Sequence, residues 1–136
     1  MVHTILGIFF VLHGLVHLLY FALSRKVFEL EPPLVGWPDQ SWLFSSFLAV
    51  SGTRLLASVL YGLATLSFVI AGFSFLANAT WANTLLIGAA IFSSVVIFFF
   101  WDGQWQRLPD KGFVGIAINL AVAVLVILLE RSIVTL

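Results

Sequence analysis

Long apolar stretches, separated by short polar segments, make up most of the chain. A helix needs roughly 20 apolar residues to cross the hydrocarbon core of a bilayer. Four stretches approach or reach this length, at about residues 4–23, 54–75, 84–101 and 112–129. Their residues do not alternate between polar and apolar types, as the strands of a membrane β-barrel would. The pattern therefore predicts one all-α integral membrane domain over residues 1–136, folded as a four-helix transmembrane bundle.

A fifth apolar segment, residues 41–50, is too short to span a membrane. Ser51-Gly52-Thr53 separates it from the apolar stretch that follows. We interpret the segment as a short interfacial or re-entrant helix between the first and second spanning helices. The alternative is a tilted extension of the second helix.

Composition supports a membrane protein and excludes several other classes. The chain is 62% hydrophobic and only 9% charged, whereas soluble domains carry about 25% charged residues. Six basic side chains are balanced by six acidic ones, which leaves too little positive charge for the phosphate contacts of a nucleic-acid partner. The absence of cysteine excludes disulfides, thiolate metal sites and iron–sulfur clusters.

The basic residues predict an orientation in the membrane. Most of them lie after the first span, at the start of the second span or after the third span, which share one side of the membrane: Arg25, Lys26, Arg54, Arg107 and Lys111. The termini and the segment between the second and third spans carry one basic side chain, Arg131. Because cytoplasmic loops are enriched in Lys and Arg, we expect a multi-pass protein of the cell membrane with both termini outside.

Polar residues inside the predicted spans are costly in hydrocarbon unless they find partners. His13 and His17 are four residues apart and therefore lie on one face of the first helix. Tyr20 and Ser24 fall on the same stripe, and His3 lies near its outer end. We expect this polar face to point into the bundle.

Counting along the helices places one polar group from each helix at nearly the same depth. At about 1.5 Å per residue, each lies roughly 10 Å from the loop-side end of its span. These groups are His17, Tyr61, Ser94 and Asn119. His13 lies one turn deeper, and Arg54 lies at the rim. We expect the six residues to form a polar layer in the cytoplasmic half, and we take them as candidate ligand-binding residues.

Structural interpretations compete with this functional one. The serines and the asparagine suit interhelical hydrogen bonds, and Arg54 can extend to the interface. Two histidines on one helical turn cannot be the two axial ligands of a single haem. The spans contain no acidic residue or cysteine that would complete a metal site. The sequence indicates no catalytic residue, metal or cofactor, and haem and quinone are not favoured.

Short motifs are spread over nearly the whole chain. They include His13-Gly14-Leu15-Val16-His17-Leu18, Arg54-Leu55-Leu56 and Gly115-Ile116-Ala117-Ile118-Asn119-Leu120. These motifs resemble a group of small prokaryotic four-helix membrane proteins that are similar in shape to the DoxX-like proteins. The resemblance implies a prokaryotic cytoplasmic membrane and a four-helix bundle, and it implies no established reaction. Some DoxX-related proteins are tied to quinone-linked redox systems.

We therefore expect a non-enzymatic membrane protein in contact with membrane lipid. Its polar layer binds a lipid-like or amphipathic ligand, or docks in a larger membrane complex or a homo-oligomer. One alternative is a redox or quinone-associated subunit, in which His13, His17 and Tyr61 hydrogen-bond to a quinone head. The other alternative is a transporter or channel component.

Overall fold

Four long helices account for most of the protein in the computed structural model, which describes residues 1–29 and 37–134. They are α1 (Val2–Ser24), α2 (Val50–Leu76), α3 (Ala82–Phe99) and α4 (Phe113–Val134). Each is long and apolar enough to cross a membrane. The structure thus confirms an all-helical, four-helix architecture, with helix ends that differ by a few residues from those expected.

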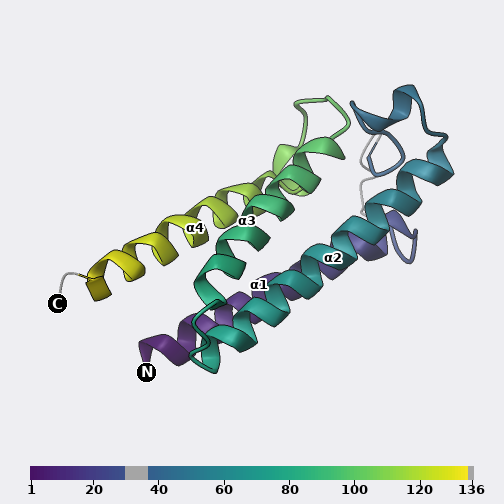
Figure 1. The fold of residues 1–136 in the computed structure, drawn as a ribbon. Coiled ribbons are helices and arrows are strands. Elements are labelled where there is room, and N and C mark those ends of the chain that lie inside the picture. Colours follow the sequence, from purple (N-terminus) through teal and green to yellow (C-terminus); the bar gives the residue numbers. More distant parts are fainter. Residues whose placement is uncertain (30–36, 135–136) are drawn as a thin grey trace.

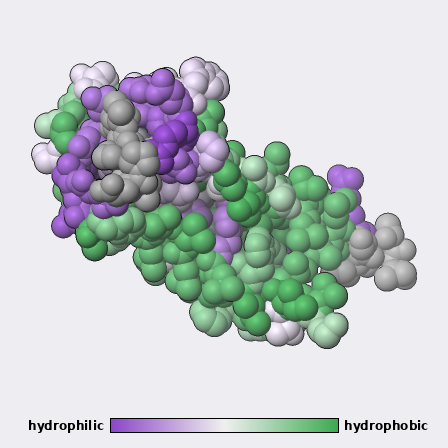
Figure 2. Space-filling model, turned by 180° about the vertical axis from the view of Figure 1, so that it is seen from behind, coloured by the Kyte–Doolittle hydropathy of each residue, from purple (hydrophilic) through white to green (hydrophobic). Residues whose placement is uncertain are grey.

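The helices give the molecule two distinct ends (Figure 1). At the loop end, α1 and α3 end and α2 and α4 begin. At the terminal end lie both chain termini and the short turn between α2 and α3. Hydrophilic residues gather at the loop end in the view of Figure 2, and the helical surface beyond it is mostly hydrophobic. This distribution is typical of a bundle whose sides face lipid.

Glycine allows α1 and α2 to pack closely along their length. A Cβ atom at Gly14 would lie 2.7 Å from the Cβ of Phe68 and 3.2 Å from the backbone nitrogen of Val69. A Cβ at Gly72 would lie 2.9 Å from the backbone nitrogen of Val11. Small residues at such crossings let helix backbones approach, which is a main source of helix association in membranes.

Two apolar clusters fill the interior. The cluster toward the terminal end draws on all four helices, and Phe10, Phe68, Leu86 and Val126 are among its fully buried members. The cluster toward the loop end is aromatic, with Tyr20, Tyr61 and Phe100 among its members.

The segment expected to be a short interfacial or re-entrant α-helix contains only one 3₁₀ turn, η1 (Phe44–Ser46). It is not an extension of the second helix either, because α2 begins at Val50. Hydrogen bonds fasten the segment to the end of α3 and to Trp101, which lies just beyond it. The backbone N–H of Trp42 donates to the carbonyl of Trp101 at 2.8 Å, and its indole Nε1–H donates to the carbonyl of Phe98 at 2.7 Å.

These contacts explain why the segment is irregular. The last carbonyls of a helix have no partner within the helix, and the Ser41 hydroxyl, like Trp42, donates to one of them, that of Phe99. The segment therefore caps α3 while also forming local hydrogen bonds of its own, such as the one from the N–H of Leu48 to the carbonyl of Phe44 at 2.8 Å.

A buried ion pair closes the connection between α3 and α4. The Lys111 Nζ lies 2.7 Å from the Asp102 Oδ2, and the two side chains are 2% and 0% exposed. Lys111 also donates to the carbonyl of Gln104 at 3.2 Å. Lys111 belongs to the 3₁₀ turn η2 (Leu108–Lys111), which leads directly into α4. The pair therefore fixes where α4 starts.

Replacing Gly14 tests the close packing of α1 on α2. We expect Gly14→Ala to lower the free energy of unfolding by about 1–3 kcal/mol, because the added methyl meets backbone atoms that cannot move aside. Gly88→Ala is the matched control, since nothing lies within 4 Å of a Cβ placed there. Its unfolding free energy should stay unchanged or rise by up to about 1 kcal/mol. Titration of folded protein in mixed micelles with a denaturing detergent measures both, and equal behaviour of the two variants would refute the packing argument.

Candidate functional site

Polar side chains from α1 and α4 meet in the interior of the bundle. The His13 Nε2–H donates to the Asn119 Oδ1 at 2.7 Å, and the side chains are almost fully buried. The amide oxygen only accepts hydrogen bonds, so this contact requires the proton on Nε2 of His13. This bond connects α1 and α4, which make few other close contacts with each other. α4 packs mainly along α3.

His17 extends the contact to α3. Its Nδ1–H donates to the backbone carbonyl of His13 at 3.1 Å, which fixes the imidazole ring. With the proton on Nδ1, the neutral ring presents Nε2 as an acceptor, and the Ser93 hydroxyl donates to it. Ser93 is completely buried and lies on the inner face of α3.

The carboxamide of Asn119 closes the arrangement. Its Nδ2 donates to the Ser93 Oγ at 3.0 Å and to the Ser94 Oγ at 3.1 Å. The Ser94 hydroxyl donates in turn to the carbonyl of Ala90 at 2.8 Å. We call His13, His17, Ser93, Ser94 and Asn119 the polar network. Its donors are paired with acceptors, in the network or in the helix backbone. Such pairing lowers the free-energy cost of burying polar groups in hydrocarbon.

Four of the six candidate residues belong to the polar network: His13, His17, Ser94 and Asn119. Ser93, which lies next to Ser94, was not among the residues expected from the sequence. Counting residues gives the depth of a side chain and not the face of the helix on which it lies. Whether these residues bind a ligand stays a prediction.

Tyr61 lies outside the polar network, closer to the loop end. Its ring stacks on Tyr20, with centroids 5.3 Å apart, and it is almost completely buried. Its hydroxyl makes no hydrogen bond within the part of the chain that the structure describes. Thr65 donates to the backbone carbonyl of Tyr61 at 3.1 Å and so does not reach the hydroxyl.

Arg54 also lies apart from the polar network. Its Nε–H donates to the backbone carbonyl of Ser24 at 2.9 Å, at the last residue of α1. The same Nε lies 3.5 Å from the Asp39 Oδ1. A cation at the C-terminus of a helix meets the negative end of the helix dipole, so the visible role of Arg54 is to secure the end of α1.

An aromatic ring from α2 packs against the two histidines of the polar network. The Phe68 ring packs against both imidazoles, with its centroid 4.9 Å from that of His13 and 5.5 Å from that of His17. Within residues 1–29 and 37–134, no group of three or more His, Cys, Asp or Glu side chains is placed to hold a metal ion. The hydrogen bonds of the polar network join α1, α3 and α4, and a ligand would have to break some of them to enter it.

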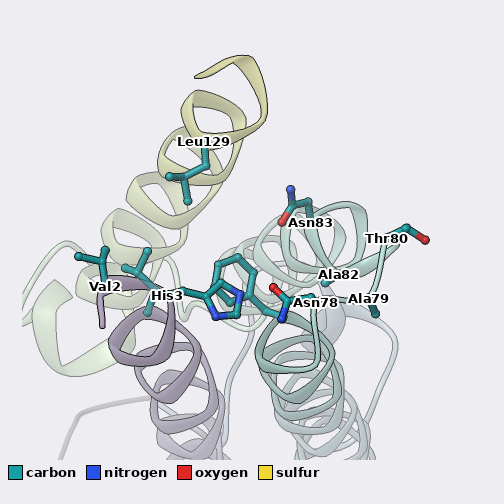
Figure 3. Close-up of a pocket in the computed structure, with 10 residues that line it drawn as sticks. Val2, His3, Asn78, Ala79, Thr80, Ala82, Asn83 and Leu129 are labelled. Atoms are coloured by element: carbon teal, nitrogen blue, oxygen red, sulfur yellow. The ribbon is translucent and has the colours of Figure 1, made fainter. Parts of the chain in front are cut away.

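A second feature, a hollow of about 330 Å³, lies at the terminal end (Figure 3). It lies beyond the apolar cluster that contains Phe10. Residues from all four helices and from the turn between α2 and α3 line it: Val2, His3, Leu6, Phe75, Asn78, Ala79, Thr80, Ala82, Asn83 and Leu129.

The wall of the hollow is polar on one part and apolar on another. The His3 ring stacks on Phe75, with centroids 4.5 Å apart and planes 18° apart. Asn78 and Asn83 add carboxamide groups at the turn between α2 and α3. Leu129 borders the hollow from α4, whose last turns stand apart from the start of α1 in Figure 3.

The hollow follows from how α4 is attached. α4 makes its extensive contacts with α3 and few with α1, and the hydrogen bond of Asn119 to α1 lies near the loop end of α4. Sequence patterns indicated the depth of polar groups but not the separation of two helices, so they gave no signal for the hollow beyond the presence of His3 at this end.

No family model, curated protein or solved structure matches the chain. The class of the protein is therefore defined by its own geometry, an all-helical protein with four helices that are each able to span a membrane. The resemblance to DoxX-like proteins stays a prediction.

Replacing Asn119 tests whether the polar network holds α4. Asn119→Leu leaves the His13 donor without its acceptor and removes both donors to the serines, so we expect a loss of about 1–3 kcal/mol in the free energy of unfolding. Ser67→Ala is a suitable control, because Ser67 is only partly buried and its hydroxyl donates within its own helix, to the carbonyl of Leu63 at 2.8 Å. Unfolding in mixed micelles should separate the two variants, and a fully stable Asn119→Leu protein would show that the network is not structural.

Proposed function

We propose that this protein is a non-catalytic membrane protein that binds a lipid-like, amphipathic molecule taken from the bilayer. The observation that carries the proposal is the hollow at the terminal end, which has polar and apolar walls. It is bordered by α1 and α4, which make few close contacts with each other. Ligand sites are typically concave and mainly apolar, with a few polar groups that orient the ligand.

The hollow is a better site for such a ligand than the polar network. In the network, the hydrogen-bonding groups are bonded to one another and buried. In the hollow, the side chains of His3, Asn78 and Asn83 form no hydrogen bond with another residue that the structure describes. A ligand there exchanges the bonds of these groups to water for bonds to its own head, and it breaks no hydrogen bond that holds the described helices together.

The apolar cluster around Phe10 and Phe68 lies between the hollow and the polar network. The proposed ligand therefore occupies one leaflet, with its polar end toward the terminal end and its apolar part against Leu6 and Leu129.

The proposal includes an orientation in a prokaryotic cell membrane, with the termini and the hollow outside and the loop end in the cytoplasm. The exposed basic residues Arg25 and Arg107 at the loop end support it. The apolar side chains of Trp42 and Phe47 are 46% and 66% exposed. They suit a segment that lies at the membrane interface, where tryptophan is enriched.

Filling the hollow tests the proposed binding. We expect native mass spectrometry of the detergent-purified protein to find a retained lipid, and Leu129→Trp to weaken its retention about tenfold, which corresponds to about 1.4 kcal/mol. The matched control is Leu120→Trp, because Leu120 is 67% exposed on the same helix and does not line the hollow. The control should retain lipid as the unchanged protein does. Equal retention in both variants, or no lipid in the unchanged protein, would contradict the proposal.

Single cysteines test the orientation, because the chain has no cysteine of its own. Thr80 and Gln106 are both exposed, at the terminal end and the loop end respectively. We expect a membrane-impermeant maleimide added to whole cells to label Thr80→Cys and not Gln106→Cys. After the cells are opened, both variants should react. The reverse pattern in whole cells would invert the proposed topology.

A further inference from the structure

The polar groups that line the hollow are uncharged carboxamides and a hydroxyl, together with one imidazole. They belong to Asn78, Asn83, Thr80 and His3, and none of the Asp, Glu, Lys and Arg residues that the structure describes lines the hollow. Bringing a charged group into a partly apolar site costs free energy unless an opposite charge receives it. The lining therefore favours a ligand whose polar end hydrogen-bonds without carrying a charge.

The lining also indicates which atoms the ligand presents. A carboxamide can donate through Nδ2 and accept through Oδ1, and a neutral imidazole can do both through its two nitrogens. Stacking on Phe75 holds the His3 ring in place, so these nitrogens are presented at a fixed position. Hydroxyl groups and ester carbonyls complement such a set, because the first donate and accept and the second accept.

The size of the hollow limits how much of the ligand it encloses. About 330 Å³ lies at the lower end of the range of roughly 300–1,000 Å³ that is usual for small-molecule sites. A polar head and the first part of a chain fit within it. The rest of an acyl chain would lie along the apolar surfaces of α1 and α4. Leu6 of α1 and Leu129 of α4 line the side of the hollow that faces these surfaces.

From these observations we propose that the hollow binds the uncharged, hydroxyl- and ester-bearing head of a neutral glycerolipid, of which diacylglycerol is the simplest. This inference rests on the proposed function and adds the class of lipid. The glycerol hydroxyl and ester carbonyls bond to His3 and Asn83, and the acyl chains leave the hollow between α1 and α4.

Photolabelling of the full chain in phosphatidylcholine vesicles tests the inference. One arm contains a photoreactive diacylglycerol, and a second contains a photoreactive phosphatidylglycerol, which has similar chains and a negative charge. We expect the diacylglycerol probe to label peptides that contain hollow residues, several-fold more strongly than the anionic probe.

Two variants test the contacts of the head. His3→Phe keeps a ring that can stack on Phe75 but removes the ring nitrogens. Asn83→Leu replaces the carboxamide with an apolar side chain of similar size. Each should reduce labelling by the diacylglycerol probe about tenfold. Thr84→Val is the control, because Thr84 is exposed, lies next to Asn83 and does not line the hollow. Its labelling should not change, and an unchanged helical circular dichroism spectrum shows that each variant is folded.

The outcomes separate this inference from the proposed function. Stronger labelling by the anionic probe at the hollow, or equal labelling of His3→Phe, Asn83→Leu and Thr84→Val, overturns the neutral-head inference and leaves lipid binding in place. Failure of both probes, while native mass spectrometry still finds a lipid whose retention Leu129→Trp weakens, also overturns the inference alone. Failure of both probes together with the absence of retained lipid overturns both.

Discussion

The closed set of hydrogen bonds among His13, His17, Ser93 and Asn119 is the constraint on which the arrangement of the bundle depends. Hydrocarbon offers no water to satisfy an imidazole or a carboxamide, so these groups are tolerated only when they bond to one another. Because the donors come from three helices, the requirement sets the positions of α1, α3 and α4 relative to one another. Glycine packing supplies the remaining constraint, between α1 and α2.

The location of this polar network has a consequence for the rest of the molecule. Asn119 lies in the first half of α4, so its hydrogen bond joins α4 to α1 near the loop end. Beyond this level, Val122 and Val126 pack into the apolar cluster, and Leu129 borders a hollow. The molecule thus has a buried, hydrogen-bonded interior, which is suited to structure, and a hollow at the opposite end, which is suited to a ligand.

Apolar length was sufficient to predict four helices, because the cost of an unbonded backbone in lipid leaves few alternatives to a helix. Depth counting placed Asn119 level with His17 and His13 one turn deeper, and in the structure Asn119 bonds to His13. It could not distinguish Ser93 from Ser94, because helix rotation depends on packing. Residues 41–50 were expected to form a helix, but they contain one 3₁₀ turn, and Ser41 and Trp42 donate to carbonyls at the end of α3, a tertiary contact that residue spacing does not encode. The hollow depends on where two helices separate, which residue spacing does not encode.

The three histidines of the chain offer the most direct test, because His3 lines the hollow while His13 and His17 belong to the closed network. In nanodiscs that contain histidine-labelled protein and the lipid that co-purifies with it, magnetisation transfer from lipid glycerol protons to imidazole rings can be measured by NMR. The account predicts transfer to the ring of His3 and none to the rings of His13 and His17. Transfer to His13 or His17, or to no histidine, would contradict it.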